Sequence, residues 1–137
     1  MKGIVLLSHG PMAKGVFETT QWFMGVDIPQ YGYLCLEPDD KIDDYDKKLN
    51  SFIEDVDTGE GVIVFTDLFG GTPSNRCVQF MSNNIDIIAG MNLSIVLEQL
   101  GNRLSDSYDF EALVETGKNG IVHLNTMNLD KGDDFLD

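Results

Sequence analysis

Positive charge is scarce in this chain of 137 residues: nine Lys and Arg stand against 23 Asp and Glu, and the formal net charge is −14. Affinity for nucleic acid comes from Lys and Arg side chains that neutralise phosphates. The composition therefore excludes a nucleic-acid-binding protein. It also implies that any phosphate handled by this chain must be stabilised locally, by backbone N–H groups and helix ends.

Long apolar runs are also missing. No stretch reaches the length of a membrane span, and the first predicted strand begins at residue 3, which leaves no room for a signal peptide. The only two cysteines, Cys35 and Cys77, lack the spacing of metal ligands. We therefore expect reduced thiols in a cytoplasmic protein, and neither a metal ion nor a cofactor.

Hydrophobic residues, in contrast, make up 42% of the chain and include eight Phe and four Tyr. This is enough for a globular domain with a substantial core. We expect one domain over residues 1–128, followed by a polar, acidic tail over residues 129–137.

Short aliphatic runs alternate with stretches of helical spacing along the chain. The runs predict strands at residues 3–7, 31–36, 61–65, 85–89 and 121–124. The helical spacing predicts helices at residues 11–24, 40–55, 72–81, 93–104 and 109–116, with a break at 117–120. Trp22, Phe23 and Met24 are expected to pack within the first of these helices. The alternation predicts an α/β fold with a mainly parallel central sheet flanked by helices on both faces.

Glycine-containing loops follow three of the predicted strands, at residues 8–10, 67–71 and 90–92. Right-handed crossovers place the carboxyl ends of parallel strands at one edge of the sheet. Ligands of open α/β sheets bind at that edge. We therefore expect the three loops to converge there.

His9 follows the first strand directly, with Gly10 suited to a sharp turn and Pro11 to the first position of a helix. Asp67 lies in the loop just after the third strand, within reach of His9 if the two strands are neighbours. A carboxylate that accepts a hydrogen bond from Nδ1–H leaves Nε2 unprotonated and nucleophilic. This pair predicts reversible phosphoryl transfer to and from His9 Nε2, a reaction that mainly requires positioning and charge stabilisation.

The remaining site residues predicted to bind phosphate are those that offer loop amides or a hydroxyl: Gly10, Gly70, Gly71 and Thr72. Each has a plainer alternative. The glycines can serve backbone shape alone, Thr72 can be a helix N-cap, and Asp67 can cap a turn.

Four more polar residues have open roles. Ser8 is interpreted as a turn residue, and His123 as a structural or surface residue of the last strand. Arg76 is either an anion ligand or a solvated cation. Lys14 has the same two alternatives as Arg76.

The motif His9-Gly10-Pro11, paired with the string from Asp67 to Asn75, resembles the mannose/fructose/sorbose family of phosphotransferase-system (PTS) IIA components. That string reads Asp67-Leu68-Phe69-Gly70-Gly71-Thr72-Pro73-Ser74-Asn75. The likeness continues through residues 89–93 and 114–117. It implies a homodimeric cytoplasmic domain with a four-stranded parallel sheet. A fifth, antiparallel edge strand, here residues 121–124, would be exchanged between subunits.

The resemblance also implies a function. His9 would accept a phosphoryl group on Nε2 from the carrier protein HPr and pass it to a His of the IIB component, which serves sugar uptake through the membrane components IIC and IID. Asp67 matches the family's orienting carboxylate, and Thr72 its phosphate-contacting hydroxyl residue. Ser94 stands where family members often have Pro, and no linker to a IIB domain follows, so IIB is expected to be a separate polypeptide.

Three other functions remain open on the sequence. The first is a phosphoryl relay to another acceptor, like the related phosphoryl donor of dihydroxyacetone kinase. The second is a receiver-like domain phosphorylated on Asp67, although Ser8 and His9 stand where such domains place an acidic pair. The third is a small-ligand binding module in which His9 only lines the site.

Overall fold

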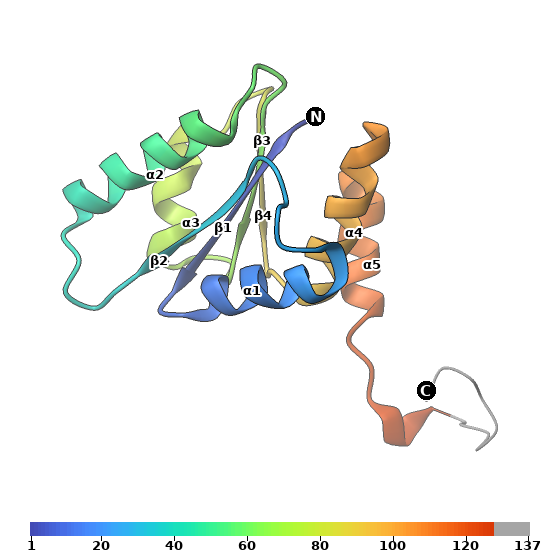
Figure 1. The fold of residues 1–137 in the computed structure, drawn as a ribbon. Helices are drawn as coiled ribbons and strands as arrows, with labels where there is room; N and C mark the ends of the chain where they lie inside the picture. The colour runs from blue at the N-terminus through green and yellow to red at the C-terminus, as the bar shows by residue number, and fades with distance from the viewer. Residues whose placement is uncertain (128–137) are drawn as a thin grey trace.

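The computed structural model describes residues 1–127, which fold around one sheet (Figure 1). The strands are β1 (Gly3–His9), β2 (Tyr31–Leu36), β3 (Val62–Thr66) and β4 (Ile85–Ala89). All pairs are parallel and the order is β2-β1-β3-β4. The α/β fold class is therefore confirmed, and the predicted tail over 129–137 lies outside the described residues.

Helices follow the strands in turn. They are α1 (Met12–Met24), α2 (Ile42–Val56), α3 (Gly71–Cys77), α4 (Leu93–Asn102) and α5 (Phe110–Asn119), with short 3-10 helices η1 (Val78–Phe80), η2 (Arg103–Ser105) and η3 (Leu124–Thr126). Helices α2 and α3 lie on one face of the sheet, and α1 and α4 lie on the other, where α5 packs against α4 (Figure 1). None of the helices in residues 1–127 is long and apolar enough to cross a membrane.

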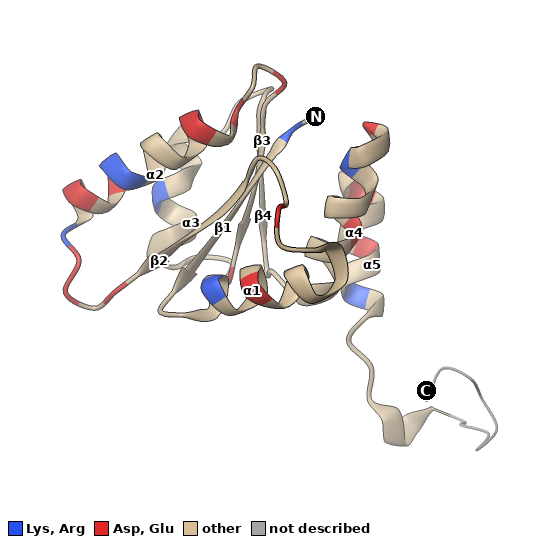
Figure 2. Ribbon diagram, in the orientation of Figure 1, with Lys and Arg blue, Asp and Glu red and all other residues tan. Residues whose placement is uncertain are grey.

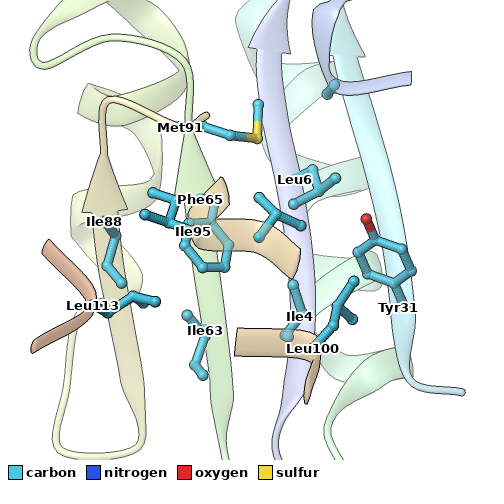
Figure 3. Packing of buried hydrophobic residues seen from close by; sticks show 12 residues of the cluster. Ile4, Leu6, Tyr31, Ile63, Phe65, Ile88, Met91, Ile95, Leu100 and Leu113 are labelled. Carbon is cyan, nitrogen blue, oxygen red and sulfur yellow. The ribbon is translucent and has the colours of Figure 1, made fainter. Parts of the chain in front are cut away.

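The strands are nearly all aliphatic because helices bury both faces of the sheet. Residues alternate between the faces along each strand. Ile4 and Leu6 of β1 pack toward α1 and α4, in the cluster drawn in Figure 3, whereas Val5 and Leu7 pack toward α2. Strands β1 and β3 are neighbours, with Leu7 opposite Thr66. This register brings the residues that follow each strand, His9 and Asp67, to the same place.

The expected packing of Trp22, Phe23 and Met24 is wrong. Trp22 is 90% exposed, Phe23 is 64% exposed, and Met24 is 38% exposed. The inward side of α1 carries Ala13 and Thr20, both fully buried. Trp22 comes two residues after Thr20, and a rotation of about 100° per residue puts it on the opposite side of the helix.

The predicted break at 117–120 is also wrong, because α5 runs on to Asn119. Gly117 sits inside the helix, where a Cβ would lie 2.8 Å from Cγ2 of Ile95 in α4. The glycine therefore permits close approach of α5 to α4. It does not end the helix.

Residues 121–124 form no strand within the single chain, contrary to the prediction. They leave the end of α5 and lead away from the sheet into η3 (Figure 1). Ile121 is 81% exposed and Leu124 is 54% exposed. A strand needs a neighbouring strand, and inside the described chain this segment reaches none. Its exchange between two subunits stays a prediction.

Candidate functional site

The side chains of His9 and Asp67 meet at the carboxyl edge of the sheet. Oδ2 of Asp67 accepts a hydrogen bond from the backbone N–H of His9 at 2.9 Å and lies 2.9 Å from the ring Nδ1. The His9 side chain is 45% exposed and that of Asp67 only 9%. The carboxylate is thus held below an accessible imidazole, as predicted from the strand ends.

The Asp67 carboxylate is kept ionised by its neighbours. Burial acts to raise its pKa, but hydrogen bonds from the His9 backbone and ring and from the Leu68 N–H outweigh burial, and the pKa lies below its ordinary value. Its other oxygen, Oδ1, accepts from Leu68 N–H at 2.9 Å. An ionised carboxylate at Nδ1 favours the tautomer with hydrogen on Nδ1 and a free lone pair on Nε2.

Gly71 lies directly against the imidazole. A Cβ at this position would be 2.9 Å from Cε1 and 3.4 Å from Nε2 of His9. Gly70 and Gly71 both have positive φ, +82° and +80°, a conformation that side-chain-bearing residues rarely adopt. The two glycines therefore serve backbone shape, and Gly71 also leaves room for the ring.

The turn after His9 is formed by Gly10, whose φ is +58°. The Gly10 N–H donates to the carbonyl of Leu36 at 2.8 Å. Pro11 precedes the first residue of α1. Because its N–H is already bonded, Gly10 contributes the turn to this site.

Ser8 has more than the turn-filling role assigned from sequence. It is fully buried. Its hydroxyl donates to the carbonyl of Gly10 at 2.8 Å and accepts from the N–H of Ala13, in the first turn of α1, at 2.8 Å.

A cavity of about 490 Å³ opens beside the imidazole. The loop after β1 lines it, together with Thr72, which lies in the first turn of α3. The loop between β2 and α2, which sequence reasoning missed, supplies most of the remaining wall. The lining residues are His9, Gly10, Pro11, Leu36, Glu37, Pro38, Asp40, Ile42 and Thr72. Figure 2 shows how acidic this loop is.

Thr72 is not the N-cap of α3. Helix α3 begins at Gly71, Gly70 occupies the capping position, and no side chain caps the helix. The two glycines with positive φ start the helix earlier than the Thr-Pro pair predicts. Thr72 therefore lies in the first turn and lines the cavity beside His9.

The third predicted loop, residues 90–92, starts at the same edge, since the N–H of Met91 donates to the carbonyl of Thr66 at 2.8 Å. It borders a different cavity, of about 190 Å³, together with residues of α4 and α5. The loops at 8–10 and 67–71 thus meet around His9 as predicted, whereas the loop at 90–92 lies at a separate cavity next to β4.

Arg76 and His123 lie apart from the imidazole. The guanidinium of Arg76 pairs through two nitrogens with Asp46 of α2, and this pairing lowers the pKa of the Asp46 carboxyl. Arg76, whose side chain is 39% exposed, therefore joins α3 to α2 through this pair. His123 lies in the segment after α5 and is exposed on the surface.

Among residues 1–127, no three His, Cys, Asp or Glu side chains gather closely enough to hold a metal ion. What the site does offer is a nucleophilic nitrogen, a buried carboxylate that orients it, and an open cavity beside it. Fold and site together define an α/β protein with a carboxylate-oriented histidine at the carboxyl edge of a parallel sheet.

The chain belongs to the fructose/mannose-type family of PTS IIA components. The family model described as "EIIA-man: PTS system fructose IIA component" matches residues 3–117. The match includes the strand ends that carry His9 and Asp67.

Two curated relatives agree with this assignment. The chain is 28% identical over 134 residues to the PTS system mannose-specific EIIAB component of Escherichia coli (strain K12), covering 93% of this chain but 41% of that protein. It is 26% identical over 110 residues to the PTS system fructose-specific EIIA component of Bacillus subtilis (strain 168), covering 75% of this chain and 71% of that protein. The chain thus spans less than half of the first relative.

Solved structures share the fold. The PTS IIA protein associated with the fucose utilization operon from Streptococcus pneumoniae superposes with a TM-score of 0.83 at 26% identity, over 90% of this chain and 93% of that one. The mannose/sorbose-specific IIA subunit from Enterococcus faecalis superposes with a TM-score of 0.77 at 24% identity, over 95% and 100%. At this identity the second likeness shows the fold alone.

Proposed function

We propose that this chain is a phosphoryl carrier of a sugar phosphotransferase system, acting in the cytoplasm. It accepts a phosphoryl group from phosphorylated HPr on Nε2 of His9 and passes it to the IIB component, which serves the membrane components IIC and IID. The observation that carries this proposal is the 2.9 Å contact between Nδ1 of His9 and Oδ2 of Asp67, which leaves Nε2 free beside an open cavity.

In the accepting step, the lone pair of Nε2 attacks phosphorus, and the P–N bond to the donor's histidine breaks. The donor keeps the electron pair of that bond. The imidazole of His9 gains positive charge as the new P–N bond forms, and Asp67 stabilises this charge through Nδ1–H. Transfer to IIB reverses the same steps on another histidine. Both directions need only positioning and charge stabilisation.

The phosphoryl oxygens would be held by the start of α3. We assign the N–H groups of Gly70 and Gly71 and the hydroxyl of Thr72 to this role, because Gly71 touches the imidazole and Thr72 lines the same cavity. The first N–H groups of a helix have no partner within it. Gly10 would act by forming the turn, since its N–H is already bonded to Leu36.

We also propose that two copies pair through β4. This strand is at the edge of the sheet, and a mostly apolar cavity of about 710 Å³ lies next to it, lined by residues including Phe69, Ile87 and Phe110. An open strand edge favours pairing with another strand. Residues 121–124 of a second copy, with exposed Ile121 and Leu124, are the strand that the family resemblance supplies.

Incubation with phosphorylated HPr tests the carrier function. We expect an acid-labile phosphoryl label on the wild-type chain and on the control variant His123→Ala, and none on His9→Ala. Label on His9→Ala would contradict the role of His9. Absence of label on the wild type would favour a binding module, and wild-type label that no IIB component accepts would point to a relay for another acceptor.

A further inference from the structure

A buried hydroxyl comes immediately before each of the two functional residues. Ser8 precedes His9, and Thr66 precedes Asp67. Both hydroxyl residues are 0% exposed. Strand positions this close to a site are usually aliphatic in a sheet covered on both faces, so a hydroxyl at both positions calls for a physical explanation.

The Ser8 hydroxyl ties the turn that carries His9 to the helix that follows. It donates to the carbonyl of Gly10, two residues on, and accepts from the N–H of Ala13 in α1, both at 2.8 Å. The three bonded groups belong to the end of β1, the turn and the start of α1. Movement of His9 relative to α1 would break one of these hydrogen bonds.

The Thr66 hydroxyl likewise ties the loop that carries Asp67 to the helix that follows, through the hydroxyl of Ser74. Its Oγ1 lies 2.6 Å from Oγ of Ser74 in α3, and the Ser74 hydroxyl donates to the carbonyl of Leu68, two residues after Thr66. The Thr66 hydroxyl itself lies 3.4 Å from the same carbonyl oxygen. One arrangement of hydrogens satisfies both contacts: Ser74 donates to Leu68, and Thr66 donates to Ser74. The end of β3, the loop and α3 are thereby joined.

The two links lie on opposite faces of the sheet. Alternation along β1 and β3 directs Ser8 toward the face covered by α1 and Thr66 toward the face covered by α3. The His9–Asp67 contact lies between them, and Oδ2 accepts from both the backbone and the ring of His9. Each link fixes one partner of this contact from its own side.

We propose that Ser8 and Thr66 are positioning residues, which hold Nδ1 of His9 and Oδ2 of Asp67 in contact by tying each loop to its following helix. The effect on phosphoryl transfer rests on the proposed carrier function. The effect on the His9–Asp67 contact itself does not.

Thr20 provides a matched control. It is also 0% exposed, and its hydroxyl bonds the carbonyl of Phe17 and the hydroxyl of Tyr31, each at 2.8 Å. It lies in the middle of α1 and joins α1 to β2. Its removal deletes a buried hydroxyl of the same kind without touching either loop of the site.

The experiment compares Ser8→Ala, Thr66→Val and Thr20→Val in the full chain. Carboxyl ¹³C NMR follows the titration of Asp67, and imidazole ¹⁵N shifts report the tautomer of His9. We expect the first two variants to raise the Asp67 pKa toward its ordinary value and to mix the tautomers, and Thr20→Val to change neither. Thr66→Ser, which keeps the hydroxyl, should restore the wild-type titration.

Transfer from phosphorylated HPr should slow ten- to a hundred-fold in Ser8→Ala and Thr66→Val, since small displacements of reacting groups cost rates of this order. In an Asp67→Asn background the same two changes should cost less than two-fold, because the contact they hold is already lost. If Thr66→Val does not fold, Ser74→Ala breaks the same link.

The proposal is overturned if folded variants of both links leave the Asp67 titration and the His9 tautomer unchanged. It is also overturned if Ser8→Ala and Thr66→Val slow transfer in the Asp67→Asn background by the same factor as in the wild-type chain. A chain that takes no label at all would instead defeat the carrier function, and the NMR result would still decide whether the two hydroxyls position the pair.

Discussion

The edge of the sheet at His9 and the outer side of β4 differ in how complete they are within one chain. At the His9 edge, Asp67 holds the imidazole ring, and the carbonyl of Leu36 accepts from the turn at Gly10. The N–H of Ala13, at the start of α1, donates to the Ser8 hydroxyl. Beside β4, the described chain leaves an open strand edge and an apolar cavity, and the segment 121–124 that follows α5 is exposed. The first region has its contacts within one chain, and the second is where we propose that another strand pairs.

This difference indicates that the contacts that stabilise the fold and those proposed for pairing of two copies lie in different parts of the molecule. The helices bury both faces of the sheet, so the fold does not need a second copy to form its core. Pairing at β4 would then add an interface without rebuilding the site, because β4 is separated from β1 by β3. Four changes test this separation.

The largest effect is expected from Asp67→Asn. It keeps the shape of the side chain but removes the charge that holds Nδ1–H, and loss of such an orienting carboxylate slows histidine-dependent catalysis roughly 10⁴-fold in a hydrolase triad. Rapid-quench transfer from phosphorylated HPr measures the change. An unchanged rate would mean that Asp67 is only a turn residue, and a change in oligomeric state would mean that the two regions are coupled.

Gly71→Ala should slow transfer by roughly 10- to 100-fold through a different cause, displacement of the ring. Gly70→Ala is the matched control. Both positions have φ near +80°, so both variants carry backbone strain of about 1–3 kcal/mol. Only at Gly71 would the new Cβ meet His9, at 2.9 Å from Cε1, whereas at Gly70 nothing lies within 4 Å. Equal rates for the two variants would refute contact with the ring as the cause.

The double variant Val122→Asp/Leu124→Asp should weaken the proposed dimer at least ten-fold. The two side chains lie two residues apart, on one side of an extended strand, and both are about half exposed in the single chain. Light scattering coupled to gel filtration measures the mass over a range of concentrations, with His123→Ala as the control. A wild-type chain that stays monomeric at high micromolar concentration would contradict pairing. We expect His9 labelling of the double variant within two-fold of wild type.

The smallest effect is the pH dependence of stability at the His9 edge. The pKa of Asp67 is lower in the folded chain than its ordinary value, so the ionised carboxylate stabilises the fold. That stabilisation is fully present above about pH 4, the ordinary pKa of Asp, and is lost as pH falls through the folded pKa. Urea unfolding of wild type and Asp67→Asn should therefore differ by about 1–2 kcal/mol near neutral pH and converge in acid. A constant difference across pH would assign the stabilisation to another group.

The parts of the site that could be predicted from sequence are those that follow a strand. A histidine and an aspartate placed directly after aliphatic runs must emerge at the carboxyl edge of a parallel sheet, and β1 and β3 prove to be neighbours. The strands at 31–36 and 85–89 were predicted with the bounds that the structure has. These bounds could be predicted because they depend on local sequence: a short apolar run between polar turn residues is typical of a buried strand.

Features that depend on packing between distant residues were missed or predicted wrongly. Gly117 was interpreted as a break because its contact with Ile95 is not visible in sequence. Thr72 resembled an N-cap because the positive φ of the preceding glycines was unknown. Ser8 resembled a turn filler because its acceptor and donor partners, Gly10 and Ala13, become neighbours of the hydroxyl only in the folded turn. A hydroxyl before both functional residues was the one signal that could have singled out Ser8 and Thr66.

By itself, the sequence determined the α/β alternation, the family, and the pair of side chains at the sheet edge, since each follows from the order of apolar and polar residues along the chain. Tertiary structure alone decided that β1 lies beside β3, that Oδ2 of Asp67 meets Nδ1 of His9, and that Gly71 lies against the ring. The reason is physical: residue type sets what a segment can bury or expose, whereas a contact of 2.9 Å between residues 58 positions apart exists only after helices on both faces have fixed the strands.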